Sequence, residues 1–158
     1  MPLGTAHANG YVGLDGASIG VENQLNDELN PHGMRLRLGM RLSDLLDFEL
    51  HLGGGTDNAT AVFNSFSAAY LGAYLKGYLP LGQRSAAFAL AGVSGISYSQ
   101  EIDDRYFTDT QSGLSFGFGL ETQSTDRLDL SADYMLYSND GSQFSELSAM
   151  SFGIKYYF

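Results

Sequence analysis

Residues 34–42 read MRLRLGMRL, a stretch in which every second side chain is large and apolar. Arg35, Arg37 and Arg41 occupy alternate positions, together with Gly39. Successive side chains of a β-strand point to opposite faces, so this period of two indicates a strand with one apolar and one charged face. In a soluble barrel or sandwich the apolar face would point inward. In a membrane barrel it would face lipid, and the arginines would point into the lumen.

The composition excludes several classes of protein. A length of 158 residues suits one domain, and 20 glycines beside 10 tyrosines and 10 phenylalanines suggest many strands joined by tight turns. No run of about 18 apolar residues is present, so the sequence predicts no transmembrane helix. The chain has no cysteine, which excludes disulfides and cysteine-ligated metals. Its net charge of -10 argues against nucleic acid as a partner.

Alternation of apolar and polar residues recurs in eight segments that are separated by turn signals. The predicted strands cover residues 10–25, 33–42, 47–55, 67–81, 86–99, 113–121, 128–137 and 147–158. The first contains a change of apolar parity between Leu14 and Ile19, which predicts a bulge near Gly16. Connections after the second, fourth and sixth strands are short, whereas 54–66, 100–111 and 138–146 are long. This asymmetry is typical of an eight-stranded, antiparallel, up-and-down transmembrane β-barrel, an all-β fold.

The charges decide which face points inward. Five cations and five carboxylates share the non-apolar parity of the strands, although the chain as a whole is strongly acidic. A closed lumen needs such balance, because unpaired charge in a confined space is costly. We therefore predict a lumen ion network, which also includes a histidine, formed by Asp15, Arg35, Arg37, Arg41, Glu49, His51, Lys76, Glu121, Asp129, Asp133 and Lys155. Within it we expect Arg41 to pair with Glu49, and Lys155 with Asp129.

The final segment, FGIKYYF (residues 152–158), resembles the C-terminal signal of outer-membrane barrels. GYVGLDG near the start and LGAYLKGYLPLG in the middle resemble the small OmpA-like and opacity-type barrel domain. The resemblance implies a location in the Gram-negative outer membrane, contact with outer-membrane lipids and lipopolysaccharide, and an assembly signal at Ile154, Tyr156 and Phe158 that the barrel assembly machinery recognises. The chain has no Trp, so we expect an aromatic girdle of Tyr11, Phe48, Phe88, Tyr134, Tyr156 and Phe158.

The N-terminal segment is expected to lie outside the barrel. Ala6-His7-Ala8 has the small-x-small form of a signal peptidase site, although no charged or long apolar region precedes it. We interpret residues 1–8 as a remnant of a signal peptide or of cloning, or as an ordinary flexible terminus, and residues 9–158 as the barrel.

Three functions compete for such a barrel. The first is a structural or surface-interaction role with a charge-plugged lumen, the second a narrow porin-like channel for ions or small solutes, and the third a lipid A-modifying enzyme. Catalysis of the third kind needs a histidine near a serine and a carboxylate, and only His7, His32 and His51 are available. Since the sequence supplies no such set, we predict that the protein is not an enzyme and uses no cofactor. We also expect it to be a monomer.

The long connections are acidic. They carry one cation, Arg105, and nine carboxylates: Asp27, Glu28, Asp57, Glu101, Asp103, Asp104, Asp109, Asp140 and Glu146. We expect these loops to be extracellular, and the short turns and both termini to be periplasmic. Glu101, Asp103, Asp104 and Asp109 are weak candidates for a divalent-cation site, but the spacing and turn glycine of an EF-hand are missing, so we predict no metal site.

Overall fold

The computed structural model describes residues 9–23, 28–29, 32–57, 65–102, 105–137 and 144–158. No helix in these ranges is long and apolar enough to cross a membrane. The regular elements are β1 (Gly10–Asn23), β2 (Glu28–Leu29), β3 (His32–Ser43), β4 (Leu46–Asp57), β5 (Ser65–Pro80), β6 (Ser85–Ile102), β7 (Arg105–Thr125), β8 (Leu128–Tyr137) and β9 (Phe144–Tyr157).

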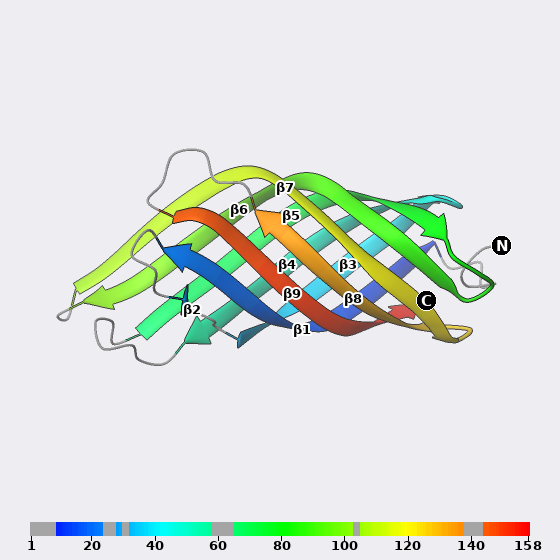
Figure 1. The fold of residues 1–158 in the computed structure, drawn as a ribbon, viewed down its shortest axis with the longest axis horizontal. Coiled ribbons are helices and arrows are strands. Elements are labelled where there is room, and N and C mark those ends of the chain that lie inside the picture. The colour runs from blue at the N-terminus through cyan, green and yellow to red at the C-terminus, as the bar shows by residue number, and fades with distance from the viewer. Residues whose placement is uncertain (1–8, 24–27, 30–31, 58–64, 103–104, 138–143) are drawn as a thin grey trace.

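The long strands close into a barrel. Each pairs antiparallel with its neighbour in the chain, and β9 pairs with β1 (Figure 1). The two-residue β2 pairs only with the end of β1, so the barrel itself consists of the eight strands β1 and β3–β9. This confirms the predicted eight-stranded antiparallel barrel.

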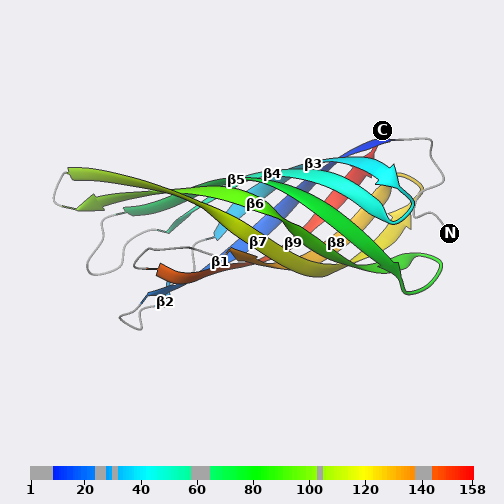
Figure 2. The same cartoon turned by 90° about the horizontal axis from the view of Figure 1, so that it is seen from above.

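The two ends of the barrel differ. Short turns join β3 to β4, β5 to β6 and β7 to β8, and the start of β1 and the end of β9 lie at this end (Figure 1). At the other end β6 and β7 extend beyond their neighbours (Figures 1 and 2). We call these the turn end and the loop end.

Two predicted loops are shorter than expected. β4 continues to Asp57 and β5 begins at Ser65, so both ends of segment 54–66 are strand. Most of segment 100–111 is also strand, because β6 and β7 pair as far as Ile102 and Arg105. Polar composition misled the prediction here, since two strands can pair with each other beyond the barrel wall without an apolar face.

The predicted bulge near Gly16 is wrong. The register of β1 against β9 runs unshifted from Tyr11 to Glu22, and a shift occurs only between Glu22 and Asn23. Asp15 and Ala17 are both buried on the inner face, so the small Ala17 occupies a lumen position and the strand needs no extra residue there.

The inner and outer faces follow the alternation of β3. Arg35 and Arg37 are at most 1% exposed, whereas Leu38 is 49% exposed and Met34 61%. The same holds on β7, where Phe116 and Phe118 are more than half exposed. The apolar face therefore points outward and the arginines point into the lumen, as in a membrane barrel.

The aromatic girdle is partly wrong. Tyr156 and Phe158 are exposed on the outer face, and Phe48 and Tyr134 are partly exposed there. Tyr11 and Phe88 are instead buried in the lumen. They fill space left by glycines, because a Cβ atom at Gly39 would collide with the Tyr11 ring and one at Gly119 with the Phe88 ring.

Candidate functional site

The charged interior of the barrel is the candidate site. Among the described residues it contains six carboxylates, five cations and one histidine, all but Arg41 less than 5% exposed. We call this set the interior ion network: Asp15, Arg35, Arg37, Arg41, Asp47, Glu49, His51, Lys76, Glu121, Asp129, Asp133 and Lys155. It is arranged in three layers along the barrel.

An arginine layer lies farthest from the turn end. Arg35 donates from Nε to Asp15 Oδ2 at 2.8 Å, and its two terminal nitrogens bind both carboxylate oxygens of Asp133. Arg37 Nη2 donates to Asp15 Oδ1 and to Ser131 Oγ, each at 2.6 Å. Such forked, charge-assisted contacts fix geometry as well as charge. They tie β3 to β8, which are not neighbours in the sheet, so they cross the lumen.

Glycine leaves room for this layer. A Cβ atom at Gly153 would collide with the Asp15 carboxylate, and one at Gly13 would lie 2.9 Å from Arg37 Nε. The absence of a side chain at Gly153 and Gly13 therefore makes space for the charged groups of this layer.

A lysine–glutamate layer lies next toward the turn end. Lys76 Nζ is 3.1 Å from Glu49 Oε1 and 2.8 Å from Glu121 Oε2, and Lys155 Nζ is 2.5 Å from Glu121 Oε1. His51 Nε2 lies 2.7 Å from Glu49 Oε2. These contacts form one chain from β4 through β5 and β7 to β9, which again crosses the lumen.

Aromatic rings surround the two ammonium groups. Lys76 Nζ lies 3.9 Å from the centroid of the Phe88 ring, and Lys155 Nζ lies 4.2 Å from that of Tyr11. Tyr11 Oη also donates to Glu49 Oε1 at 2.5 Å. Cation–π contacts of this kind stabilise a cation where water is excluded.

A third layer lies at the turn end. Arg41 Nε lies 3.6 Å from Asp47 Oδ1, and Tyr78 Oη donates to Asp47 Oδ2 at 2.6 Å. Tyr157 Oη donates to Asp129 Oδ2 at 2.9 Å. The Arg41 guanidinium also lies over the Tyr157 ring, 5.6 Å from its centroid.

Apolar and aromatic side chains occupy the lumen on the loop side of the arginine layer. Met135 and Tyr137 follow Asp133 along β8 toward the loop end, and both are buried. The centroids of the Tyr70 and Tyr137 rings are 5.6 Å apart. The lumen is therefore filled by side chains well beyond the charged layers.

Residues 3–158 match the family described as the outer membrane protein beta-barrel domain. The chain belongs to this family. The match places it among outer-membrane barrels, which agrees with the outward apolar band. No curated protein sequence matches the chain.

Solved outer-membrane barrels share the fold. Neisserial surface protein A (NspA) is 19% identical with a TM-score of 0.83, over 96% of this chain and 98% of that one. Ail, the attachment invasion locus protein of Yersinia pestis, is 12% identical with a TM-score of 0.74, over 97% and 100%. The outer membrane enzyme PagL is 13% identical with a TM-score of 0.55, over 90% and 98%. At these identities the likeness concerns the fold alone.

This outer-membrane barrel places all eleven residues predicted for the lumen on its inner face, but it pairs some of them differently. Arg41 is the register partner of Asp47 and contacts it, whereas Glu49 lies opposite Gly39 and binds Lys76. The predicted Arg41–Glu49 pair is therefore wrong.

The second predicted pair is also replaced. Lys155 and Asp129 are register partners, yet the Lys155 ammonium binds Glu121, and Asp129 accepts the hydrogen bond from Tyr157. The sequence prediction missed Asp47, although its parity is that of Glu49, two residues later. It also gave no role to the hydroxyls of Tyr11, Tyr78 and Tyr157.

The remaining candidates lie elsewhere. His32 begins β3 and is exposed on its outer side. His7, Asp103 and Asp104 fall outside the described residues; Glu101 and Asp109 belong to β6 and β7 by their backbone, and their side chains are not described. Within the described ranges no group of three or more acidic or histidine residues could hold a metal ion.

Proposed function

We propose that this outer-membrane barrel is closed by its interior ion network, is not an enzyme, and acts in a structural or surface-interaction role through its loop end. The observation that carries the proposal is the set of ion pairs that cross the lumen in two successive layers. The arginine layer and the lysine–glutamate layer both join strands that are not neighbours in the sheet, so a solute would have to break several charge-assisted contacts to pass.

The proposed orientation puts the loop end outside the cell and the turn end in the periplasm. The short turns that join β3 to β4, β5 to β6 and β7 to β8 at the turn end support it, because outer-membrane barrels have short periplasmic turns and longer extracellular loops. The similar proteins NspA and Ail are named as a surface protein and an attachment protein. A surface role at the loop end suits this arrangement.

The environment of His51 supports the absence of catalysis. Its Nε2 contacts Glu49, its ring lies 4.4 Å from that of Tyr74, and it is fully buried in the lumen. No serine of the described residues donates a hydrogen bond to a histidine, so a nucleophile with its base is missing there. The fold alone does not distinguish an enzyme from a protein without catalytic activity, because the outer membrane enzyme PagL has the same fold.

Solute flux tests this proposal against its alternative, a narrow channel. Proteoliposomes with the protein should swell in small uncharged solutes no faster than empty liposomes. A variant with Glu121→Ala should swell faster, because Glu121 is the common partner of Lys76 and Lys155. Fast swelling with the unaltered protein, unchanged by this substitution, would support the channel instead.

We further propose that Ile154, Tyr156 and Phe158 form the signal for the barrel assembly machinery. Ile154 and Tyr156 are exposed on the outer face of β9, the strand that closes the barrel against β1, and Phe158 is exposed directly after it. Side chains on this outer face are available for recognition before the barrel closes.

Deletion of Phe158 should reduce insertion in cells and leave refolding in detergent largely intact. Phe152→Ala is the matched control, because Phe152 is also an outward-facing phenylalanine of β9, 59% exposed. Equal insertion of the deletion and the control would contradict the signal.

A further inference from the structure

At Gly16 the outer wall of the barrel has a gap that neither packing nor backbone geometry explains. Register pairs align Phe152, Gly16 and Met34 across β9, β1 and β3, and both large side chains are more than half exposed. A Cβ atom at Gly16 would meet only the Phe152 carbonyl oxygen, at 4.0 Å, and the backbone of Gly16 is not left-handed. Any residue would fit there, so glycine leaves an opening in the apolar band.

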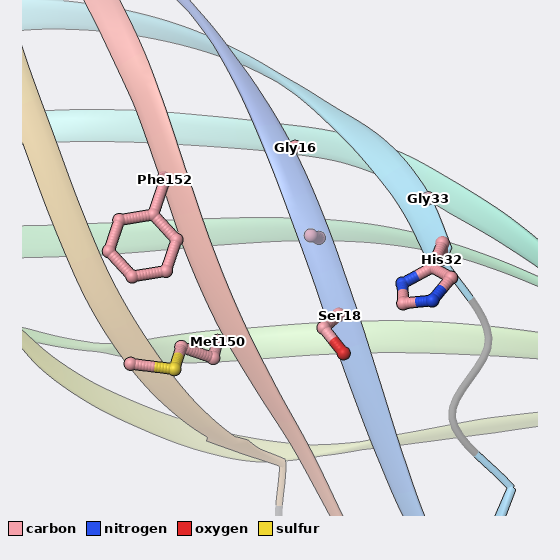
Figure 3. A pocket seen from close by; sticks show the side chains of 7 residues that line it. Gly16, Ser18, His32, Gly33, Met150 and Phe152 are labelled. Carbon is pink, nitrogen blue, oxygen red and sulfur yellow. The ribbon is translucent and has the colours of Figure 1, made fainter.

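A groove of about 340 Å³ lies over this opening. Phe152 and Met150 border it on one side and His32 on the other, with Gly16 and Ser18 on the strand between them (Figure 3). The next row toward the loop end aligns Met150, Ser18 and His32. The groove therefore has an apolar part and a polar end.

The polar end lies at the edge of the apolar band. On the outer face of β3, Leu42, Met40, Leu38, Leu36 and Met34 are followed by His32. Ten residue steps from Leu42 to His32, at about 3.3 Å per residue and a tilt near 40°, correspond to roughly 25 Å along the axis. This is about the height of the lipid-facing band of an outer-membrane barrel, so His32 is placed where hydrocarbon meets headgroups.

We propose that this groove binds a phosphorylated lipid of the outer leaflet, with an acyl chain over Gly16 and a phosphate at Ser18 and His32. The assignment to the outer leaflet rests on the orientation proposed above. A lipid is the occupant because the groove is continuous with the lipid-facing band. The Ser18 hydroxyl and the His32 imidazole N–H supply two donors for phosphate oxygens at the depth of the headgroups.

Fluorescence can measure this binding, because the chain has no Trp. Leu14→Trp places a reporter two residues from Gly16 on the same outer face, and Leu75→Trp places one two residues from Gly77 on β5. Gly77 gives the matched control, since a Cβ atom there meets nothing within 4 Å. Each protein is refolded into phosphatidylcholine vesicles containing either phosphatidic acid or phosphatidylcholine with brominated, quenching acyl chains.

At the Leu14→Trp reporter, brominated phosphatidic acid should bind with roughly tenfold higher apparent affinity than brominated phosphatidylcholine, as one charge-assisted hydrogen bond would give. Gly16→Leu and, separately, His32→Ala should each remove most of this preference. At the Leu75→Trp reporter the two lipids should quench equally, with or without Gly77→Leu. Far-UV circular dichroism should show an intact barrel in all variants.

Equal quenching by the two lipids at Leu14→Trp would overturn the proposal, as would a preference that survives either Gly16→Leu or His32→Ala. An equal preference at Leu75→Trp would also overturn it, because it would reflect general attraction of anionic lipid. Swelling assays on the same vesicles separate this result from the closed-barrel proposal: Gly16 lies outside the lumen, so Gly16→Leu should leave solute flux unchanged, whatever the flux is.

Discussion

Strands β3 and β6 belong to the same barrel, but the side chains that they turn into the lumen differ in chemistry. β3 turns Arg35 and Arg37 into the lumen and carries large apolar side chains outside. β6 has the reverse distribution of size: Phe88, Leu90 and Ile96 are buried inside, while alanines and Val93 face outward. One inner face is held by ion pairs and the other by packing.

The difference concerns what each face requires of its neighbours. A buried charge is tolerated only with its partner, so the inner face of β3 depends on particular carboxylates of β1 and β8. An apolar inner face depends mainly on filled volume. Substitutions on β3 should therefore be rescued by a change in the partner, and substitutions on β6 by a side chain of similar size.

The largest effect is expected for Arg35→Met. It leaves Asp133 in the lumen without its bidentate partner and removes one of the two partners of Asp15. The free energy of unfolding should fall by about 3 to 5 kcal/mol, or less where lumen water reaches the carboxylates. Urea titration of the refolded protein, followed by circular dichroism, measures this.

Asp133→Leu in the same chain should restore part of that loss, because both members of the pair are then absent. If the double variant lost the sum of the two single losses, Arg35 and Asp133 would not be coupled, and β3 would resemble β6.

Leu90→Ala on β6 should cost about 2 to 5 kcal/mol, through the cavity that it leaves in the lumen. Leu90 is 3% exposed and lies in a cluster with Tyr74, Phe88 and Met135. Combined with Arg35→Met its effect should be additive in the same urea titration. Strong coupling between the two would contradict the separation of the two inner faces.

The smallest effects come from conservative replacements. Leu90→Met preserves volume and should cost less than about 1.5 kcal/mol. Arg35→Lys preserves charge but loses the forked contact with Asp133, so it should cost more than Leu90→Met. The reverse order would show that volume, and not geometry of the ion pairs, controls the β3 side.

The same contrast explains what could be predicted from the sequence. The inward face of β3 could be predicted because charged residues occupy one parity and large apolar residues the other. That of β6 could not, since small residues occur on both parities and nothing in the local pattern says that Phe88 fills space beside Gly119. Alternation of apolar and polar residues was thus enough to predict where the strands lie. Which side chains point into the lumen could be predicted only where charged residues marked one parity.

Pairing within the network was harder to predict than membership. Parity places Arg41, Asp47 and Glu49 on one face, but only the register at the β3–β4 turn sets Arg41 opposite Asp47. The chain of contacts from Glu49 through Lys76 and Glu121 depends on side chains reaching across the lumen, which no local pattern specifies. The length of the β6–β7 hairpin was missed because its polar residues resemble a loop.

Single-channel recording in planar bilayers tests the central claim, that the interior ion network closes the lumen. The unaltered protein should be nearly silent. Glu121→Ala should show conductance steps, because Lys155 then loses its carboxylate partner, and Glu121→Ala with Lys155→Met should be quieter than Glu121→Ala alone. A steady conductance of the unaltered protein that neither variant changes would contradict the account.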